Sequence, residues 1–503
     1  MSQLQPYSQT SPLTTYLPQE VINSIVTFIT HKPTLSHLTQ TCRLFRDIYQ
    51  PTLYHSFHHN HDSFKNPLTS LTRVITFIRT LIARPDLAAS VKYLDFNWPP
   101  DATFLPSESE EINFLTTSIR ELGLDLPYGE ANWSYEAPHA LVPFELILAF
   151  TCNVETLTIM INDGWSLELV PQYLQQQQQL NTSAVSSGAG DRKYQRLKHL
   201  TVDYQFIAGD RLALTSDHWL PFVILAPNLE SFCVPNTDCF SESDSARVPQ
   251  MKKLQVLDFG TDCMSNEVLI TTLVRSAKAL RRVQLEWVGC NSYDDDTSVE
   301  EYSVVRVWDA LWSVRTYLED VTFNYIDEIP LGDVVLMRRG DGNVSSLVEF
   351  SRLRVLKTSG RSLEAFRQAY DLKSIATRSV DLFARQLFPQ SIEVITIYDP
   401  SSSLIPLLLA IADWKSRGEY LNLRRLEIAQ SMMWEAGGQV LDWIVQREWM
   451  EREEEVKRCL ESVKGLEFVI TVKADWFVAG RESFKRYARK VEEERRRYTY
   501  RGW

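Results

Sequence analysis

One arrangement of apolar positions recurs along most of the chain. An apolar residue is followed by two variable residues, a second apolar residue, one variable residue and a third, mostly apolar residue. The copies lie at 91–96, 154–159, 197–202, 229–234, 254–259, 280–285, 318–323, 353–358, 392–397, 423–428 and 466–471. The last two of these positions stand two residues apart, as one face of a β-strand requires. We therefore predict a strand in each of the eleven copies.

The segments between several copies carry apolar residues at helical spacing, for example in 142–150, 265–280 and 374–388. A strand followed by a returning helix, repeated many times, buries a continuous core by stacking neighbouring copies. A doubly wound α/β domain also alternates strands with helices, and it is the alternative fold. The shared strand pattern and the lack of a Gly-rich phosphate loop favour the stacked arrangement.

A second pattern, of two short helices with apolar faces, occupies residues 17–57. Leu17 and Pro18 open the first helix, where the missing N–H of Pro has no helical partner to lose. The apolar stripe of the second helix, which we expect to follow Pro33 and to end before Pro51, consists of Leu35, Leu38, Cys42, Phe45 and Tyr49. Two such helices cannot bury a core alone, so they must pack on the rest of the chain or on another protein.

This stretch resembles an F-box in its Leu-Pro-x-Glu opening, its Thr-Cys-Arg-Leu-Phe-Arg centre and its closing Pro-x-Leu-Tyr. Thr34 and Thr41 depart from the family pattern. The resemblance implies docking to the Skp-family adaptor of a cullin ubiquitin ligase. The residues that it implies for adaptor binding are Leu17, Pro18, Glu20, Val21, Ile25, Leu35, Leu38, Cys42, Arg43, Phe45, Pro51, Leu53 and Tyr54. An ordinary helical hairpin packed on the following domain is the alternative.

The recurring strand pattern is similar to that of irregular leucine-rich repeats, which are joined to F-boxes in fungal proteins. Regular repeats run 20–29 residues, and only two of the spacings here fall in that range. The Asn that usually follows the strand by three positions occurs once, at Asn162. The two resemblances together imply an α/β fold: an N-terminal helical F-box followed by an irregular leucine-rich-repeat solenoid of parallel strands and outer helices.

This interpretation divides the chain into four parts. Residues 1–16 are expected to be disordered, residues 17–60 to form the F-box, and residues 61–480 to form the solenoid. A low-complexity insertion near 175–192 is expected to be disordered within the solenoid, and residues 481–503 to form a charged tail.

Charge and composition limit the kinds of partner and the cell compartment that we expect. The net charge of −12 over 503 residues argues against a broad nucleic-acid surface, which would be basic. No segment approaches the roughly 20 apolar residues that cross a bilayer, so no membrane partner is expected. The first residues have neither a basic end nor an apolar run, unlike a signal peptide. The seven scattered cysteines, none in a CxxC pair, are typical of reduced thiols in the cytoplasm or nucleus.

No catalytic motif stands out. The chain lacks a GxSxG elbow, a Walker loop, an HExxH pair and the kinase signatures. His55, His58, His59 and His61 form the nearest approach to a metal site, but no Cys or acidic cluster completes the ligands, so we interpret them as a surface or turn cluster. We therefore expect no enzyme activity, no metal and no cofactor. A cryptic enzyme site is the least favoured hypothesis.

The strand residues between the inward apolar positions form an exposed face that can bind a protein. The candidate substrate-binding residues on it are Asp203, Asp258, Gln284, Glu286, Asn324, Tyr398 and Arg425. If the three acidic residues of this set lie on neighbouring strands, they form an acidic strip. The alternative for any single residue is that it only keeps the strand surface soluble. The F-box resemblance implies a substrate-recognition subunit of a Skp–cullin–F-box ubiquitin ligase, with an unidentified protein substrate. A non-ligase interaction scaffold is the alternative.

Overall fold

The computed structural model divides the chain into two compact units, Met1–Leu280 and Arg281–Trp503. It describes residues 18–29, 31–59, 67–97, 109–124, 142–151, 153–161, 169–170, 172–173, 176, 194–204, 216–234, 242–260, 267–288, 304–326, 347–360, 362–363, 380, 385, 387–398, 404–431, 452 and 454–473. The predictions of disorder for 1–16 and, apart from Gln176, for the insertion near 175–192 lie outside these residues. So do Leu17, His61, Asn162 and the predicted tail at 481–503.

The first unit begins with three helices rather than the two predicted: α2 (Gln19–Phe28), α3 (Lys32–Thr41) and α4 (Arg43–Tyr54). The second predicted helix is interrupted at Cys42, whose backbone is extended (φ −157°, ψ 165°). Cys42 ends α3 and begins α4, and its Sγ accepts the N–H of Phe45 at 3.5 Å. Pro51 does not end the helix as predicted, because α4 continues through it to Tyr54.

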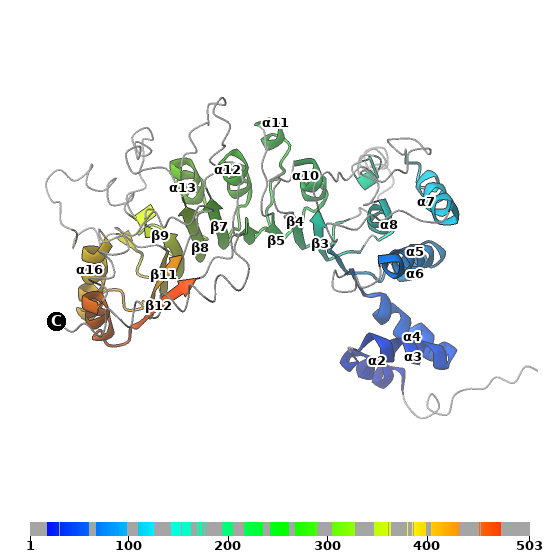
Figure 1. Cartoon of the computed structure of the whole chain (residues 1–503), viewed down its shortest axis with the longest axis horizontal. Helices are drawn as coiled ribbons and strands as arrows, with labels where there is room; N and C mark the ends of the chain where they lie inside the picture. Colours follow the sequence, from blue (N-terminus) through cyan, green and yellow to red (C-terminus); the bar gives the residue numbers. More distant parts are fainter. Residues whose placement is uncertain are drawn as a thin grey trace, which may run out of the picture. The chain divides into compact units, whose positions relative to one another are not determined.

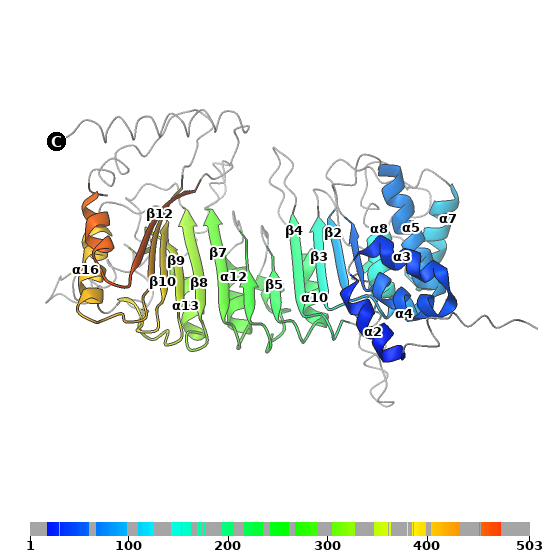
Figure 2. The same cartoon turned by 90° about the horizontal axis from the view of Figure 1, so that it is seen from below.

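Six parallel strands follow in the first unit, each paired with the next along the chain (Figure 2). They are β1 (Ser56–His59), β2 (Tyr93–Asn97), β3 (Thr156–Ile161), β4 (His199–Tyr204), β5 (Ser231–Cys233) and β6 (Val256–Asp258). The helices of this part are α5 (Pro67–Ala83), α6 (Pro85–Ala88), α7 (Ser109–Glu121), α8 (Val142–Phe150), α10 (Ser216–Leu225), α11 (Glu242–Ser245) and α12 (Glu267–Ser276). In Figure 1, α8 and α10 lie on one side of the strands.

The second unit repeats the arrangement with parallel strands that again pair in chain order. They are β7 (Arg282–Val288), β8 (Asp320–Ile326), β9 (Val355–Ser359), β10 (Val394–Tyr398), β11 (Arg425–Ser431) and β12 (Glu467–Lys473). The labelled helices of this unit are α13 (Val304–Ser313) and α16 (Ile405–Ser416).

All eleven copies of the apolar pattern form strands, β2 to β12, which confirms that part of the prediction and the α/β class. Strand β1 was not predicted, and it falls inside the range assigned to the F-box. Within each unit the strand order never reverses, so the doubly wound alternative, whose strand order does reverse, is wrong. The arrangement is that of stacked strand–helix repeats, compatible with a solenoid.

The core consists of equivalent apolar positions of the pattern, aligned on successive strands. Leu94, Leu157, Leu200, Phe232 and Leu257 lie in register on successive strands of the first unit, and all are buried. The predicted phase is wrong by one residue in the last copy. There the partners of Leu426 and Ile428 in β11 are Phe468 and Ile470, not Val469 and Thr471. The extended run of apolar residues from Phe468 to Ile470 supports either phase, so only the pairing with β11 decides between them.

Charged residues of opposite sign lie next to each other on neighbouring strands, where each strand begins. The second position of the pattern reads Lys92, Glu155, Lys198, Glu230 and Gln255 in the first unit, and Arg281, Glu319, Arg354, Glu393 and Arg424 in the second. The backbone N–H of Glu155 donates to the carbonyl of Lys92 at 2.8 Å, and the two side chains form an ion pair at 3.1 Å. Alternating charge on neighbouring strands favours this register, because a slip would separate the opposite charges.

Asn side chains reinforce the same edge. Asn153 donates to the carbonyl of Ala89 at 2.8 Å, Asn228 to that of Gln195 at 2.7 Å, and Asn422 to that of Gln390 at 2.9 Å. Each of these Asn residues lies directly before a copy of the pattern, rather than three positions after the strand. The leucine-rich-repeat pattern places its Asn after the strand, so it does not predict these residues.

Candidate functional site

Helix α2 has two apolar faces, and only one of them is covered. Ile22 is buried, and Ile29, just beyond the helix, packs against the small core that Leu35 and Tyr49 form. A neighbouring face, which we call the α2 apolar face, consists of Val21, Ile25 and Phe28, exposed by 41%, 44% and 81%. The spacing of these three residues places them on one stripe. An exposed stripe of large apolar side chains on a short helix is typical of a protein contact.

The structure divides the predicted adaptor-binding residues into an exposed and a packed group. Besides Val21 and Ile25, the exposed group includes Pro18, Glu20 and Arg43. Phe28 is the most exposed of the stripe, yet it was not among the predicted binding residues. The signal was present, since Phe28 continues the helical spacing of Val21 and Ile25.

The packed group holds the helices together. Leu35 is buried, and Leu38, Phe45 and Leu53 pack on the core that it forms with Tyr49. The rings of Phe45 and Tyr49 meet edge to face with centroids 5.3 Å apart. Leu35 therefore serves the fold of this region, and its side chain is not presented to a partner. Cys42 caps α4, and Pro51 and Tyr54 are half-buried.

Aromatic stacking joins α4 to the first strand. The ring of Tyr54 stacks on Phe77 of α5 with centroids 5.8 Å apart, and Phe77 stacks on Phe57 of β1 at 4.2 Å. The Nζ of Lys32 donates to the carbonyl of Ser56 at 2.7 Å, and burial, with the nearby charge of Arg73, lowers the pKa of this amine. The helical region is therefore built onto the first strand and keeps the α2 apolar face turned outward.

The histidine cluster is only in part the surface or turn cluster that we predicted. His59 is buried in β1 against the ring of Phe144, and burial, aided by the charge of Arg73, lowers its pKa to about 4. His59 is therefore neutral at physiological pH. His58 is exposed and lies 3.3 Å from Asp95. Among the residues that the structure describes, no group of three or more metal-ligating side chains comes together.

We call the strand face opposite α8 and α10 the open face. Two of the predicted substrate-binding residues lie on it in the first unit. Asp203 lies in β4 and Asp258 in β6, with Cys233 of β5 paired to Asp258 in register. Burial, and then the charge of Asp258, raises the pKa of Asp203 to about 6. The Oδ1 of Asp258 accepts the N–H of Gly260, which has a positive φ of 72°. Glu286 belongs to the second unit, and within the first unit the predicted acidic strip consists of Asp203 and Asp258.

The remaining predicted substrate-binding residues lie in the second unit. Gln284 and Arg425 are half-buried, and Arg425 lies 3.3 Å from Glu427 and 3.7 Å from Glu467. Glu286 and Asn324 are register partners, and their side chains lie outside the described residues. Tyr398 differs from the expected exposed position. It is only 3% exposed and lies in register between the small residues Ser359 and Ala429, which leave room for its ring.

The predicted substrate-binding residues therefore fall into separate sets in the two units. No described helix is both long and apolar enough to cross a membrane. No model of a protein family matches the chain, and no curated protein matches it.

Proposed function

We propose that this protein is the substrate-recognition subunit of a Skp–cullin–F-box ubiquitin ligase. Residues 17–60 are the F-box that binds the Skp-family adaptor, and the strand–helix repeats are an irregular leucine-rich-repeat solenoid that binds a protein substrate. The protein performs no ubiquitin chemistry of its own. It raises the effective concentration of the substrate near a conjugating enzyme that the cullin recruits in the cytoplasm or nucleus.

The α2 apolar face is the observation that carries this proposal. Val21, Ile25 and Phe28 expose large apolar surface next to a helical region that already has its own core. Covering this stripe with the apolar groove of a partner removes it from water, which stabilises the complex. The exposed Pro18 and Glu20 flank the stripe and match the opening of the F-box pattern.

Replacing Ile25 with Asp tests adaptor binding. An unpaired carboxylate buried in an apolar contact costs several kcal/mol, so recovery of the adaptor should fall by about a hundredfold. Ile25 is 44% exposed, so the free protein should lose little stability. The measurement is affinity purification of the full chain from cells treated with a proteasome inhibitor, with quantification of adaptor and cullin by mass spectrometry.

Leu421→Asp is the matched control, because Leu421 is also exposed but lies in the second unit. It should retain the adaptor. Normal adaptor recovery by the Ile25→Asp protein would refute the F-box assignment. Recovery of adaptor without cullin would favour the scaffold function over the ligase function.

A further inference from the structure

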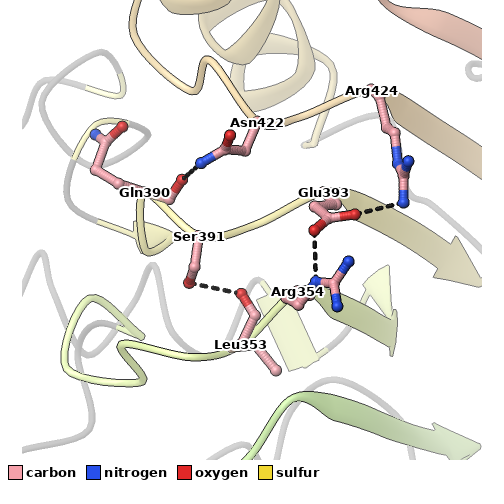
Figure 3. A network of polar contacts seen from close by, with 7 residues as sticks. All are labelled: Leu353, Arg354, Gln390, Ser391, Glu393, Asn422 and Arg424. Carbon is pink, nitrogen blue, oxygen red and sulfur yellow. Dashed lines mark hydrogen bonds and ion pairs between the residues drawn. The ribbon is translucent and has the colours of Figure 1, made fainter.

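The second unit has an arginine-lined depression where strands β8, β9, β10 and β11 begin. Its volume is about 400 Å³, and it is lined by Glu319, Arg352, Arg354, Ser391, Glu393 and Asn422. Figure 3 shows the polar contacts of this edge. The depression is open to solvent and large enough for one or two side chains of a partner.

Backbone and side-chain hydrogen bonds connect the strand ends that line the depression. The N–H of Glu393 donates to the carbonyl of Arg354 at 2.8 Å, and the N–H of Arg424 donates to that of Glu393 at 2.9 Å. The Oγ of Ser391 donates to the carbonyl of Leu353 at 2.8 Å, as Figure 3 shows. Because these polar groups are already satisfied by the protein, the depression keeps its shape without a ligand, which lowers the entropic cost of binding.

The guanidinium groups face outward and the carboxylate that they share lies below them. Glu393 accepts from both Arg354 and Arg424 (Figure 3). Its side chain is 19% exposed, whereas those of Arg354 and Arg424 are 55% and 68% exposed. The hydrogen bond from Arg354 lowers the pKa of Glu393, so the carboxylate stays ionised and holds both guanidiniums in place. Most of the five N–H donors of each guanidinium remain available.

Arg352 adds a third positive charge to this edge. It is exposed, and it forms no hydrogen bond or ion pair within the described part of the chain. Arg352, Arg354 and Arg424 together outnumber Glu319 and Glu393, in a protein whose net charge is −12. The local field therefore favours an anionic ligand, and planar guanidiniums bind carboxylates with two parallel hydrogen bonds.

Exposed apolar residues lie in the turns of the same edge. Leu421 directly precedes Asn422, Tyr317 lies two residues before Glu319, and Val348 lies four residues before Arg352. All three are about half-exposed or more. The Nε of Arg315 and the Oε2 of Glu349 form an ion pair at 3.0 Å, which joins the turns that carry Tyr317 and Val348. A free anion gains nothing from apolar neighbours, whereas a protein segment does.

We propose that this edge, which we call the arginine edge, binds an acidic segment of a partner protein through Arg352, Arg354 and Arg424. The segment places carboxylates on the guanidiniums and an apolar side chain against Leu421 or Tyr317. This inference deepens the proposed function by naming the substrate chemistry, and it rests on that function only in calling the partner a substrate. Binding of the segment itself needs no adaptor.

Selection from a library of short random peptides displayed on phage, with the full chain as bait, tests this inference. Peptides bound by the wild-type protein should be enriched in Asp and Glu beside Leu, Phe or Tyr. The variant Arg352→Glu removes no described contact and should abolish most of this enrichment. Synthetic peptides from the selection should bind this variant about tenfold more weakly, and Arg352→Glu with Arg424→Glu should weaken binding further.

Arg458→Glu is the matched control, because Arg458 is an exposed arginine of a separate helical segment in the same unit. It should leave the enrichment unchanged. The inference is overturned if wild-type selection shows no acidic enrichment, or if Arg352→Glu preserves it. It is also overturned if inorganic phosphate displaces the peptides completely while replacing their apolar residues has no effect, since the edge would then be an anion site. Ile25→Asp should keep the acidic enrichment, so this inference and the adaptor assignment fail separately.

Discussion

The ionised carboxylate of Asp203 should destabilise the first unit at neutral pH, and this cost should disappear in mild acid. Its side chain is half-buried in β4, and burial, followed by the charge of Asp258, raises its pKa from 3.8 to about 6. A carboxyl whose pKa is higher in the folded state than in the unfolded state destabilises the fold wherever it is ionised in both. The penalty is therefore complete above about pH 6 and disappears as the pH falls toward 3.8.

The size of the penalty follows from the two pKa values. Each pKa unit corresponds to about 1.4 kcal/mol, so the carboxylate costs at most about 3 kcal/mol at neutral pH. Partial solvent access screens the charge, and we expect about 1–3 kcal/mol. About half of this cost should disappear by about pH 5, because Asp203 is then mostly protonated in the folded protein and mostly ionised in the unfolded one.

Asp203→Asn removes the charge while keeping the shape of the side chain. The variant should exceed the wild-type free energy of unfolding by about 1–3 kcal/mol near pH 7.5, and by about half as much near pH 5. Urea unfolding followed by circular dichroism at both pH values measures this difference. Glu121→Gln in α7 makes the same change of charge at an exposed site and should show no such pH dependence. A difference between wild type and Asp203→Asn that does not change with pH would refute the reasoning.

Two further predictions concern Cys233, which pairs in register with Asp258, and the core around Phe232 of the same strand. Burial, together with the charges of Asp258 and Asp203, raises the pKa of Cys233 to about 12. Iodoacetamide should therefore label this thiol only after unfolding in urea. Rapid labelling of the native protein, detected by peptide mass spectrometry, would contradict this prediction. Trp219 is fully buried, with its ring centroid 5.4 Å from that of Phe232. Trp219→Ala should therefore lower the free energy of unfolding, measured by urea titration, by about 3–5 kcal/mol. A loss near zero would show that the surrounding side chains collapse into the cavity.

The local pattern of apolar residues was sufficient to locate the strands. All of the eleven predicted copies form strands, because two inward apolar residues separated by one residue satisfy the geometry of a buried strand face whatever the partner strand. The pattern did not reveal β1. That strand has only Phe57 and His59 turned inward, and a buried neutral histidine cannot be recognised from sequence as a core residue.

Local sequence also could not place the break in the second helix. The stripe from Leu35 to Tyr49 is consistent with one continuous helix, and it does share one core. The chain nevertheless turns at Cys42, which folds Phe45 and Tyr49 of α4 back onto Leu35 of α3. Pro51 stays within α4 despite its missing N–H, in a turn that packs Leu53 and Tyr54 on their neighbours.

For the candidate sites too, local sequence determined some features and the tertiary structure determined others. Sequence alone located the apolar helix and the alternating strand residues, since spacing along one element determines which residues share a face. Only the tertiary structure separated the exposed Val21, Ile25 and Phe28 from the buried Leu35, and it placed Tyr398 in the interior. The arginine edge likewise depends on turns about 30 to 100 residues apart in sequence that the strand pairing brings together. Burial and proximity between distant segments are properties of the packed chain, and no local pattern contains them.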